Sequence, residues 1–257
     1  MPLFKLTIAY DGTGFVGWQR QAEGVSIQGL LEDACAALDG QPVTVAGAGR
    51  TDAGVHALGQ VASLALERAI DPAAVVRALN ARLPPAVRVL EAHTMPDGFH
   101  ARFSARRKSY RYRIANGPVL SPFERAYAWH VPAPVLDVGA MAGAAGVLEG
   151  RHDFKAFQGT GSETHGTERV VYSTRVGRGE SGVITIDLSG NGFLRHMVRN
   201  IVGTLAEVGR GRRPADWVAE VLEAGDRALA GRTAPAAGLF LVSVEYDRAD
   251  ADTGSKI

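Results

Sequence analysis

The residues best suited to chemistry lie together in residues 46–56. Four small residues precede Arg50, Thr51 and Asp52, which bring one cation, one hydroxyl and one carboxylate, and two more small residues follow. Small residues on both sides of a carboxylate let a backbone or a flat ring from another molecule approach closely. Such a carboxylate can act as a nucleophile or a base, and Arg50 would favour its ionised form. Taken alone, the segment slightly favours a simpler interpretation, a glycine-rich turn with a surface Arg–Asp pair.

A second candidate is the alternating segment 108–114, Lys-Ser-Tyr-Arg-Tyr-Arg-Ile. In a strand, Tyr110 and Tyr112 share one face, while Arg111 and Arg113 share the other. The tyrosines could stack on bases of a nucleic acid while the arginines meet phosphates. Two core tyrosines behind an exposed arginine row explain the spacing equally well.

Two arginines four residues apart, Arg195 and Arg199, lie at the start of an amphipathic helix predicted for residues 196–208. Helix geometry alone favours solvated arginines on a surface face. His152 has no second His or Cys at ligand spacing, so we expect a structural histidine and no metal site.

Composition is typical of a globular protein without a membrane span. The chain has 257 residues, 46% of them hydrophobic and 21% charged, and one or two domains are expected. The sequence holds no apolar run of 18 residues and no signal-peptide pattern, and its single cysteine, Cys35, cannot form an internal disulfide. We therefore expect a cytoplasmic protein.

Charge distribution is more informative than the net charge of +1. Residues 98–123 contain six cations and no carboxylate. The cations are Arg102, Arg106, Arg107, Lys108, Arg111 and Arg113. Such a segment can bind an RNA backbone, although a solvated charged face remains the simpler interpretation.

The first half of the chain predicts the order strand, helix, strand, strand, helix, strand. The segments are residues 4–10, 26–38, 43–48, 60–66, 71–82 and 87–92. This is the split βαβ order of a ferredoxin-like unit. Ser26 should cap the first helix and Gly40 should end it, and Asp71 with Pro72 should begin the second.

The second half predicts a similar order. Turn residues at 116–122 suggest a domain junction, which gives an N-terminal domain of residues 1–115 and a C-terminal domain of residues 116–257. The later segments are a helix at 135–148, a hairpin formed by strands 170–176 and 183–188, helices at 196–208 and 216–223, and a strand at 239–246.

Several motifs resemble TruA-type tRNA pseudouridine synthases, and together they extend over nearly the whole chain. The segment 49–57, Gly-Arg-Thr-Asp-Ala-Gly-Val-His-Ala, closely resembles the central motif of that family. Further blocks resemble the family at residues 10–13, 17–19, 26–28, 100–105, 108–112, 152–154, 193–200 and 236–239. One departure is Gly192, where many relatives carry a side chain.

The resemblance implies an α+β fold of two ferredoxin-like, RNA-binding-like domains sharing a continuous, mostly antiparallel sheet with a central cleft. It also implies a homodimer that isomerises uridine to pseudouridine in the anticodon stem-loop of tRNA, at positions 38, 39 and 40, without a cofactor. Asp52 would be the catalytic nucleophile. Tyr110, Arg199 and Arg50 would bind the substrate, with Arg199 pairing with the catalytic carboxylate.

Two other functions would use some of the same residues. A hydrolase could use Thr51 or Ser104 with His56 and Asp52, but no segment resembles a nucleophile elbow. An RNA-binding module of the RRM type would share the fold and the aromatic residues, but would not need Asp52.

Overall fold

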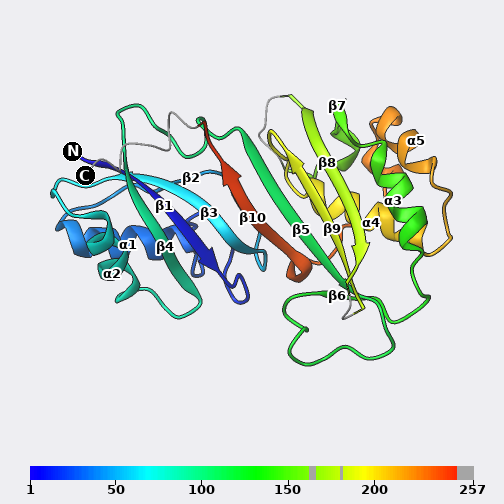
Figure 1. Ribbon diagram of the computed structural model, residues 1–257, viewed down its shortest axis with the longest axis horizontal. Helices are drawn as coiled ribbons and strands as arrows, with labels where there is room; N and C mark the ends of the chain where they lie inside the picture. The colour runs from blue at the N-terminus through cyan, green and yellow to red at the C-terminus, as the bar shows by residue number, and fades with distance from the viewer. Residues whose placement is uncertain (162–165, 180–181, 248–257) are drawn as a thin grey trace. The chain divides into compact units, whose positions relative to one another are not determined.

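Apolar residues at every second position form the first strand, β1 (Leu3–Tyr10), whose even-numbered residues are buried. The computed structural model describes residues 1–161, 166–179 and 182–247. The chain divides into two compact units (Figure 1). Unit 1 comprises Met1–Arg107 and the segment beginning at Leu241, and unit 2 comprises Lys108–Phe240.

The sheet of unit 1 has the order β4-β1-β3-β10, with β2 also paired to β3. Its strands, besides β1, are β2 (Ala46–Gly47), β3 (His56–Ala65), β4 (Val87–Met95) and, from Leu241 on, β10 (Leu239–Glu245). β1 is antiparallel to both neighbours, with Leu6 opposite Ala62 of β3 and Ala92 of β4. β2 is shorter than the predicted strand 43–48, because only Ala46 and Gly47 pair with β3.

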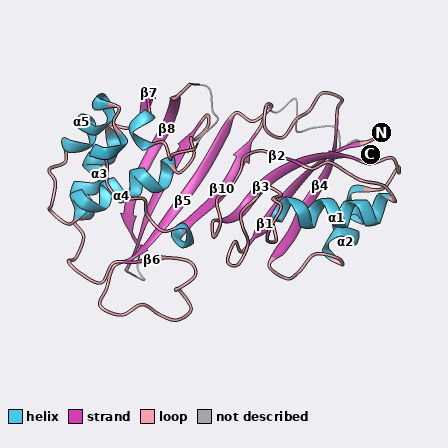
Figure 2. Ribbon diagram, turned by 180° about the vertical axis from the view of Figure 1, so that it is seen from behind, coloured by secondary structure: helices cyan, strands magenta, loops and turns pink. Residues whose placement is uncertain are grey.

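Two helices cover one face of this sheet, α1 (Ile27–Asp39) and α2 (Pro72–Asn80) (Figure 2). The predicted caps are confirmed. The Ser26 hydroxyl accepts a hydrogen bond from the Gly29 amide at 3.1 Å, and Gly40 ends α1 in the left-handed conformation, with φ 83°. The Asp71 carboxylate caps α2.

Asp39 ties the end of α1 to the segment after β3. Its carboxylate accepts hydrogen bonds from the backbone amides of Glu67 and Arg68 and from the Gln41 side chain. Burial opposes ionisation, but these hydrogen bonds prevail and hold the pKa of Asp39 below its ordinary value.

The sheet of unit 2 has the order β5-β9-β8-β7. Its strands are β5 (Arg107–Ala115), β6 (Trp129–His130), β7 (Gly150–Asp153), β8 (Glu168–Arg178) and β9 (Val183–Gly190), and β6 pairs in parallel with the end of β5. β8 and β9 form the predicted hairpin. The helices are α3 (Val138–Gly146), α4 (Met197–Gly209) and α5 (Trp217–Ala224), and they gather beside β7 and β8 (Figure 1).

The mixed α/β architecture with mostly antiparallel strands confirms the predicted fold class. The units differ from the predicted division at residue 115, because β5 pairs with β9 along its length and the last strand returns to unit 1. The shared continuous sheet and the central cleft stay predictions. Within the described residues, no helix is both long and apolar enough to cross a membrane.

Candidate active site

The loop that carries Asp52 follows β2 in unit 1, and its backbone is held from two directions. The Trp18 amide donates to the Thr51 carbonyl at 3.0 Å, and the Val55 amide donates to the Asp52 carbonyl at 3.1 Å. Gly54 adopts φ 77°, a conformation that favours glycine. Asp52 itself is half-buried, so the held backbone presents a residue that is partly exposed to solvent.

The small residues near Asp52 are contacted by the protein itself. A Cβ atom on Gly47 would come within 2.4 Å of the Trp18 ring, and one on Gly12 within 2.1 Å of the Val55 carbonyl oxygen. Trp18 is 2% exposed and packs in the core. The expectation that small residues admit another molecule is therefore wrong at Gly47, where the indole occupies the space.

A buried polar cluster lies behind the loop and joins three elements. The Tyr10 hydroxyl is 2.8 Å from Thr51 Oγ1, and Gln60 Nε2 lies 3.4 Å from the Tyr10 hydroxyl and 2.9 Å from the Gly49 carbonyl oxygen. Burial raises the pKa of Tyr10 to about 12, against the lowering effect of its hydrogen bonds to Thr51 and Gln60. Tyr10 therefore keeps its proton at neutral pH. Motifs and spacing did not single out Gln60, although a glutamine within a largely apolar strand was a usable signal.

Arg50 and His56 have partners that differ from those expected. The exposed Arg50 donates through Nε to Gln19 Oε1 at 3.0 Å rather than to Asp52. His56 is 2% exposed, and its Nδ1 accepts a hydrogen bond from the Gly12 amide at 3.0 Å, with Asp11 Oδ1 at 3.1 Å from the same atom. The Nδ1 atom of the ring is thus occupied by the turn at residues 11 and 12.

These contacts argue against the hydrolase alternative. The Thr51 hydroxyl is engaged with Tyr10, and Ser104 Oγ accepts a hydrogen bond from the backbone amide of His100 at 3.2 Å. Among the residues that the structure describes, neither candidate nucleophile therefore has the histidine ring partner that activation requires.

In unit 2, the tyrosine face of β5 is turned toward the protein. Tyr112 is fully buried, and its hydroxyl donates to the Pro235 carbonyl at 2.7 Å. Tyr110 is 9% exposed, and its ring meets the edge of Phe193 with centroids 5.1 Å apart. Tyr112 is thus a core tyrosine, and the candidate substrate residue Tyr110 lies beside the segment that leads into α4.

The arginine face of β5 meets carboxylates from distant segments. Arg111 binds Asp187 of β9 through two nitrogens, at 2.7 and 3.0 Å, and Arg113 pairs with Glu124 at 2.7 Å. The hydrogen bond to Asp187, which outweighs partial burial, raises the pKa of Arg111. The expected exposed arginine row is therefore confirmed at Arg111, while Arg113 is half-buried, and both guanidinium groups pair with carboxylates.

Arg195 and Arg199 both donate hydrogen bonds to backbone carbonyls. Arg199, on α4, is half-buried and donates through Nε to the Ala234 carbonyl at 2.8 Å, and the Ala234 amide donates back to the Arg199 carbonyl at 3.1 Å. Arg195 is exposed and donates to the carbonyls of Thr160 and Gly161 at 2.9 and 3.0 Å. The expectation of solvated arginines, drawn from helix periodicity, therefore holds for Arg195 and not for Arg199, which packs against a segment far along the chain.

The buried side chain next to Arg199 holds α4 in place. Asn200, 0% exposed, donates to the Phe157 carbonyl at 2.8 Å and accepts from Thr233 Oγ1 at 2.6 Å and Arg227 Nη2 at 3.1 Å. Burial lowers the pKa of Arg227. The helix and the segment 227–234 are therefore joined by a buried polar network that fixes the position of Arg199.

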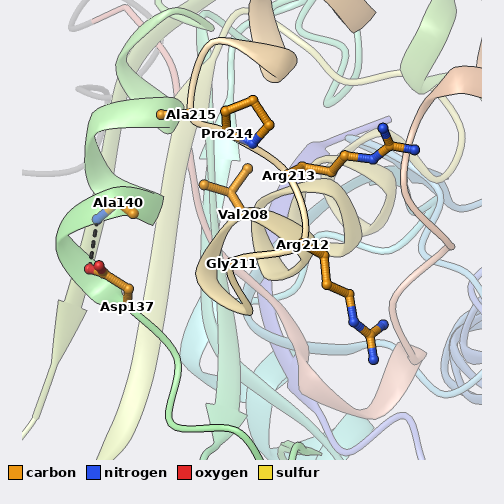
Figure 3. Close-up of a pocket in the computed structure, with 8 residues that line it drawn as sticks. All are labelled: Asp137, Ala140, Val208, Gly211, Arg212, Arg213, Pro214 and Ala215. Carbon is orange, nitrogen blue, oxygen red and sulfur yellow. Dashed lines mark hydrogen bonds between the residues drawn. The ribbon is translucent and has the colours of Figure 1, made fainter.

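A shallow pocket of about 410 Å³ lies in unit 2 (Figure 3). Eight residues line it: Asp137, Ala140, Val208, Gly211, Arg212, Arg213, Pro214 and Ala215. Asp137 caps α3 through the Ala140 amide, and Arg212 pairs with Glu207. None of the predicted site residues is among the eight. Within the described residues, no group of three or more His, Cys, Asp or Glu side chains could hold a metal ion.

The four predicted site residues are thus divided between the units. Asp52 and Arg50 lie on one loop of unit 1, and Tyr110 and Arg199 lie on β5 and α4 of unit 2. Their joint action on one substrate stays a prediction. The fold and the Asp52 loop define the chain as an α+β protein with a partly exposed aspartate on a loop that hydrogen bonds hold in place.

Comparison with known proteins identifies the family. A family model described as tRNA pseudouridine synthase matches residues 6–104 and 144–247. A tRNA pseudouridine synthase A of Syntrophotalea carbinolica is 47% identical over 254 residues, covering 99% of this chain and 100% of the relative, and one of Myxococcus xanthus is 48% identical over 246 residues, covering 96% and 92%. The chain belongs to the tRNA pseudouridine synthase family, whose members are isomerases.

Among solved structures, a Cbf5-Nop10-Gar1 complex matches with 13% identity and a TM-score of 0.35, covering 79% of this chain and 45% of that chain.

Proposed function

We propose that this chain isomerises uridine to pseudouridine in the anticodon stem-loop of tRNA, at positions 38, 39 and 40, with Asp52 as nucleophile and without a cofactor. Its membership of the family, at 47% identity over nearly the full length of a relative named for this activity, carries the proposal. The loop geometry supports it, since Asp52 is half-buried on a backbone held by Trp18 and Val55.

The chemistry suits a carboxylate. The bond between the sugar and N1 of uracil breaks, the ring turns, and a bond from the sugar to C5 forms, while the proton on C5 is lost and N1 gains one. No net electrons move, so the reaction needs no redox cofactor. Asp52 can attack the sugar or the ring of a flipped-out nucleotide and leave again when the new bond forms.

The remaining predicted site residues have roles that follow from their chemistry. We propose that Tyr110 offers a flat ring to the uracil and a hydroxyl that can move a proton. Arg199 would pair with the catalytic carboxylate, and Arg50 would contact the RNA. An RRM-type module is less favoured, because Tyr112 is fully buried and so cannot stack on a base.

The deciding experiment compares Asp52→Asn with wild type on an unmodified tRNA transcript. We expect pseudouridine mapping to find product only with wild type, while both proteins bind the tRNA with similar affinity, because the amide keeps the shape and loses the nucleophile. Asp97→Asn, a change at an exposed aspartate of the same unit, serves as the control and should retain full turnover. An Asp52→Asn variant that still forms pseudouridine would refute the assignment.

Three further parts of the proposal have separate tests. Activity should survive chelator treatment and dialysis if no cofactor is needed. Light scattering should give the mass of a homodimer. Cell fractionation should place the protein in the cytoplasm.

A further inference from the structure

The Asp52 loop depends on a buried hydrogen-bond network whose direction can be worked out from its chemistry. Gln60 Nε2 lies 2.9 Å from the Gly49 carbonyl oxygen, and the Val61 amide donates to Gln60 Oε1. A carbonyl only accepts and an amide N–H only donates, so both contacts require the same orientation of the Gln60 amide.

The orientation of Gln60 then sets the hydrogen bond of Tyr10. The second Nε2 hydrogen points to the Tyr10 oxygen, 3.4 Å away, so that oxygen accepts and its own proton is free to be donated. The acceptor is Thr51 Oγ1 at 2.8 Å. Gln60 donates to Tyr10, and Tyr10 donates to the residue immediately before Asp52.

This network adds side-chain hydrogen bonds to the backbone hydrogen bond that holds the loop. Gly49 is held by Gln60, the Thr51 side chain by Tyr10, and the Thr51 carbonyl by the Trp18 amide. Tyr10, Thr51 and Gln60 are at most 6% exposed, whereas Asp52 is half-buried. A nucleophile is preorganised when buried, ordered residues hold a partly exposed side chain in position.

We infer that Tyr10, Thr51 and Gln60 are positioning residues. They act through the Thr51 side chain and hold the Asp52 carboxylate in the position that attack requires. The inference rests on the proposed function of Asp52. The hydroxyl of Thr51 is thus required for alignment rather than for chemistry of its own, and a serine at this position should serve nearly as well.

The variants that test this remove or keep single hydroxyls. Thr51→Val and Tyr10→Phe each delete one end of the hydrogen bond, and Thr51→Ser retains it. Tyr246→Phe is the matched control, because it deletes another tyrosine hydroxyl of unit 1, which donates to the Ala101 carbonyl at 2.7 Å. Turnover of tRNA and hydrogen exchange of residues 49–56 are measured for all four.

We expect Thr51→Val and Tyr10→Phe to lower kcat by roughly tenfold or more, since small misplacements of a nucleophile are costly, while KM for tRNA changes less than about twofold. Thr51→Ser should recover most of kcat, and Tyr246→Phe should keep wild-type turnover. Exchange should become faster in residues 49–56 of the two slow variants and stay unchanged elsewhere in unit 1.

Three results would overturn the inference: Tyr10→Phe losing no more kcat than Tyr246→Phe, Thr51→Ser being as slow as Thr51→Val, or exchange rising evenly over unit 1. Wild-type protein that forms no pseudouridine would refute the proposed function instead. The exchange comparison alone would then decide whether the network holds the Asp52 loop.

Discussion

Replacing Asn200 by alanine should be among the most damaging single substitutions in unit 2. The side chain is 0% exposed and makes three hydrogen bonds, to the Phe157 carbonyl, the Thr233 hydroxyl and the Arg227 guanidinium. Alanine keeps helix propensity, so the loss comes from the partners that are left behind rather than from the helix itself.

The magnitude follows from those partners. The Phe157 carbonyl and the Thr233 hydroxyl lose a buried partner, at about 1–3 kcal/mol for each unsatisfied group. Arg227 keeps its contacts to the Gly231 carbonyl and the Thr233 hydroxyl, so its loss is smaller. The free energy of unfolding should fall by about 3–5 kcal/mol, which lowers Tm by about 8–15 °C for a chain of this size.

Urea unfolding and calorimetry measure the effect, and Asn200→Asp is the graded comparison. Aspartate keeps the acceptor for Thr233 and Arg227 but cannot donate to Phe157, so its loss should be intermediate. Hydrogen exchange should place the weakening in residues 157–161, α4 and 227–234. An Asn200→Ala variant that loses less than about 1 kcal/mol would refute the reasoning, because that is no more than the average point substitution costs.

Four further substitutions test separate features. Tyr112→Phe removes one buried hydrogen bond and should lower the free energy of unfolding by about 1 kcal/mol in urea titrations; no change would mean that water replaces the hydroxyl. Gly47→Ala should cost about 1–3 kcal/mol and shift tryptophan fluorescence, because the new methyl group meets the Trp18 ring, whereas Gly143→Ala, with open space around it, should stabilise α3 by about 0.5–1 kcal/mol. Asp39→Asn should destabilise the protein at neutral pH. Because the pKa of Asp39 is lowered in the folded state, its carboxylate stabilises the fold at pH values above the ordinary aspartate pKa. This contribution disappears as the pH falls through the folded-state pKa. A wild-type protein that is still more stable than Asp39→Asn at acid pH would contradict this.

Local patterns by themselves determined most of the secondary structure and the identity of the candidate nucleophile. The caps at Ser26 and Asp71, the alternation in β1 and β5, and the hairpin of β8 and β9 all follow from neighbouring residues, because capping and side-chain periodicity are short-range effects. The motif around Asp52 indicated the family for the same reason, since its residues are consecutive in the chain.

Only the tertiary structure decided which polar groups form hydrogen bonds or ion pairs with one another. Segment 98–123 reads as a run of unopposed cations, yet Arg111 and Arg113 meet Asp187 and Glu124. Likewise, nothing in the spacing of residues 10, 51 and 60 predicts one hydrogen-bond network. These partners lie between 11 and 76 residues apart in the chain, and periodicity carries no information about such pairs. Strand register brings them together, and the cost of burying an unpaired polar group keeps them paired.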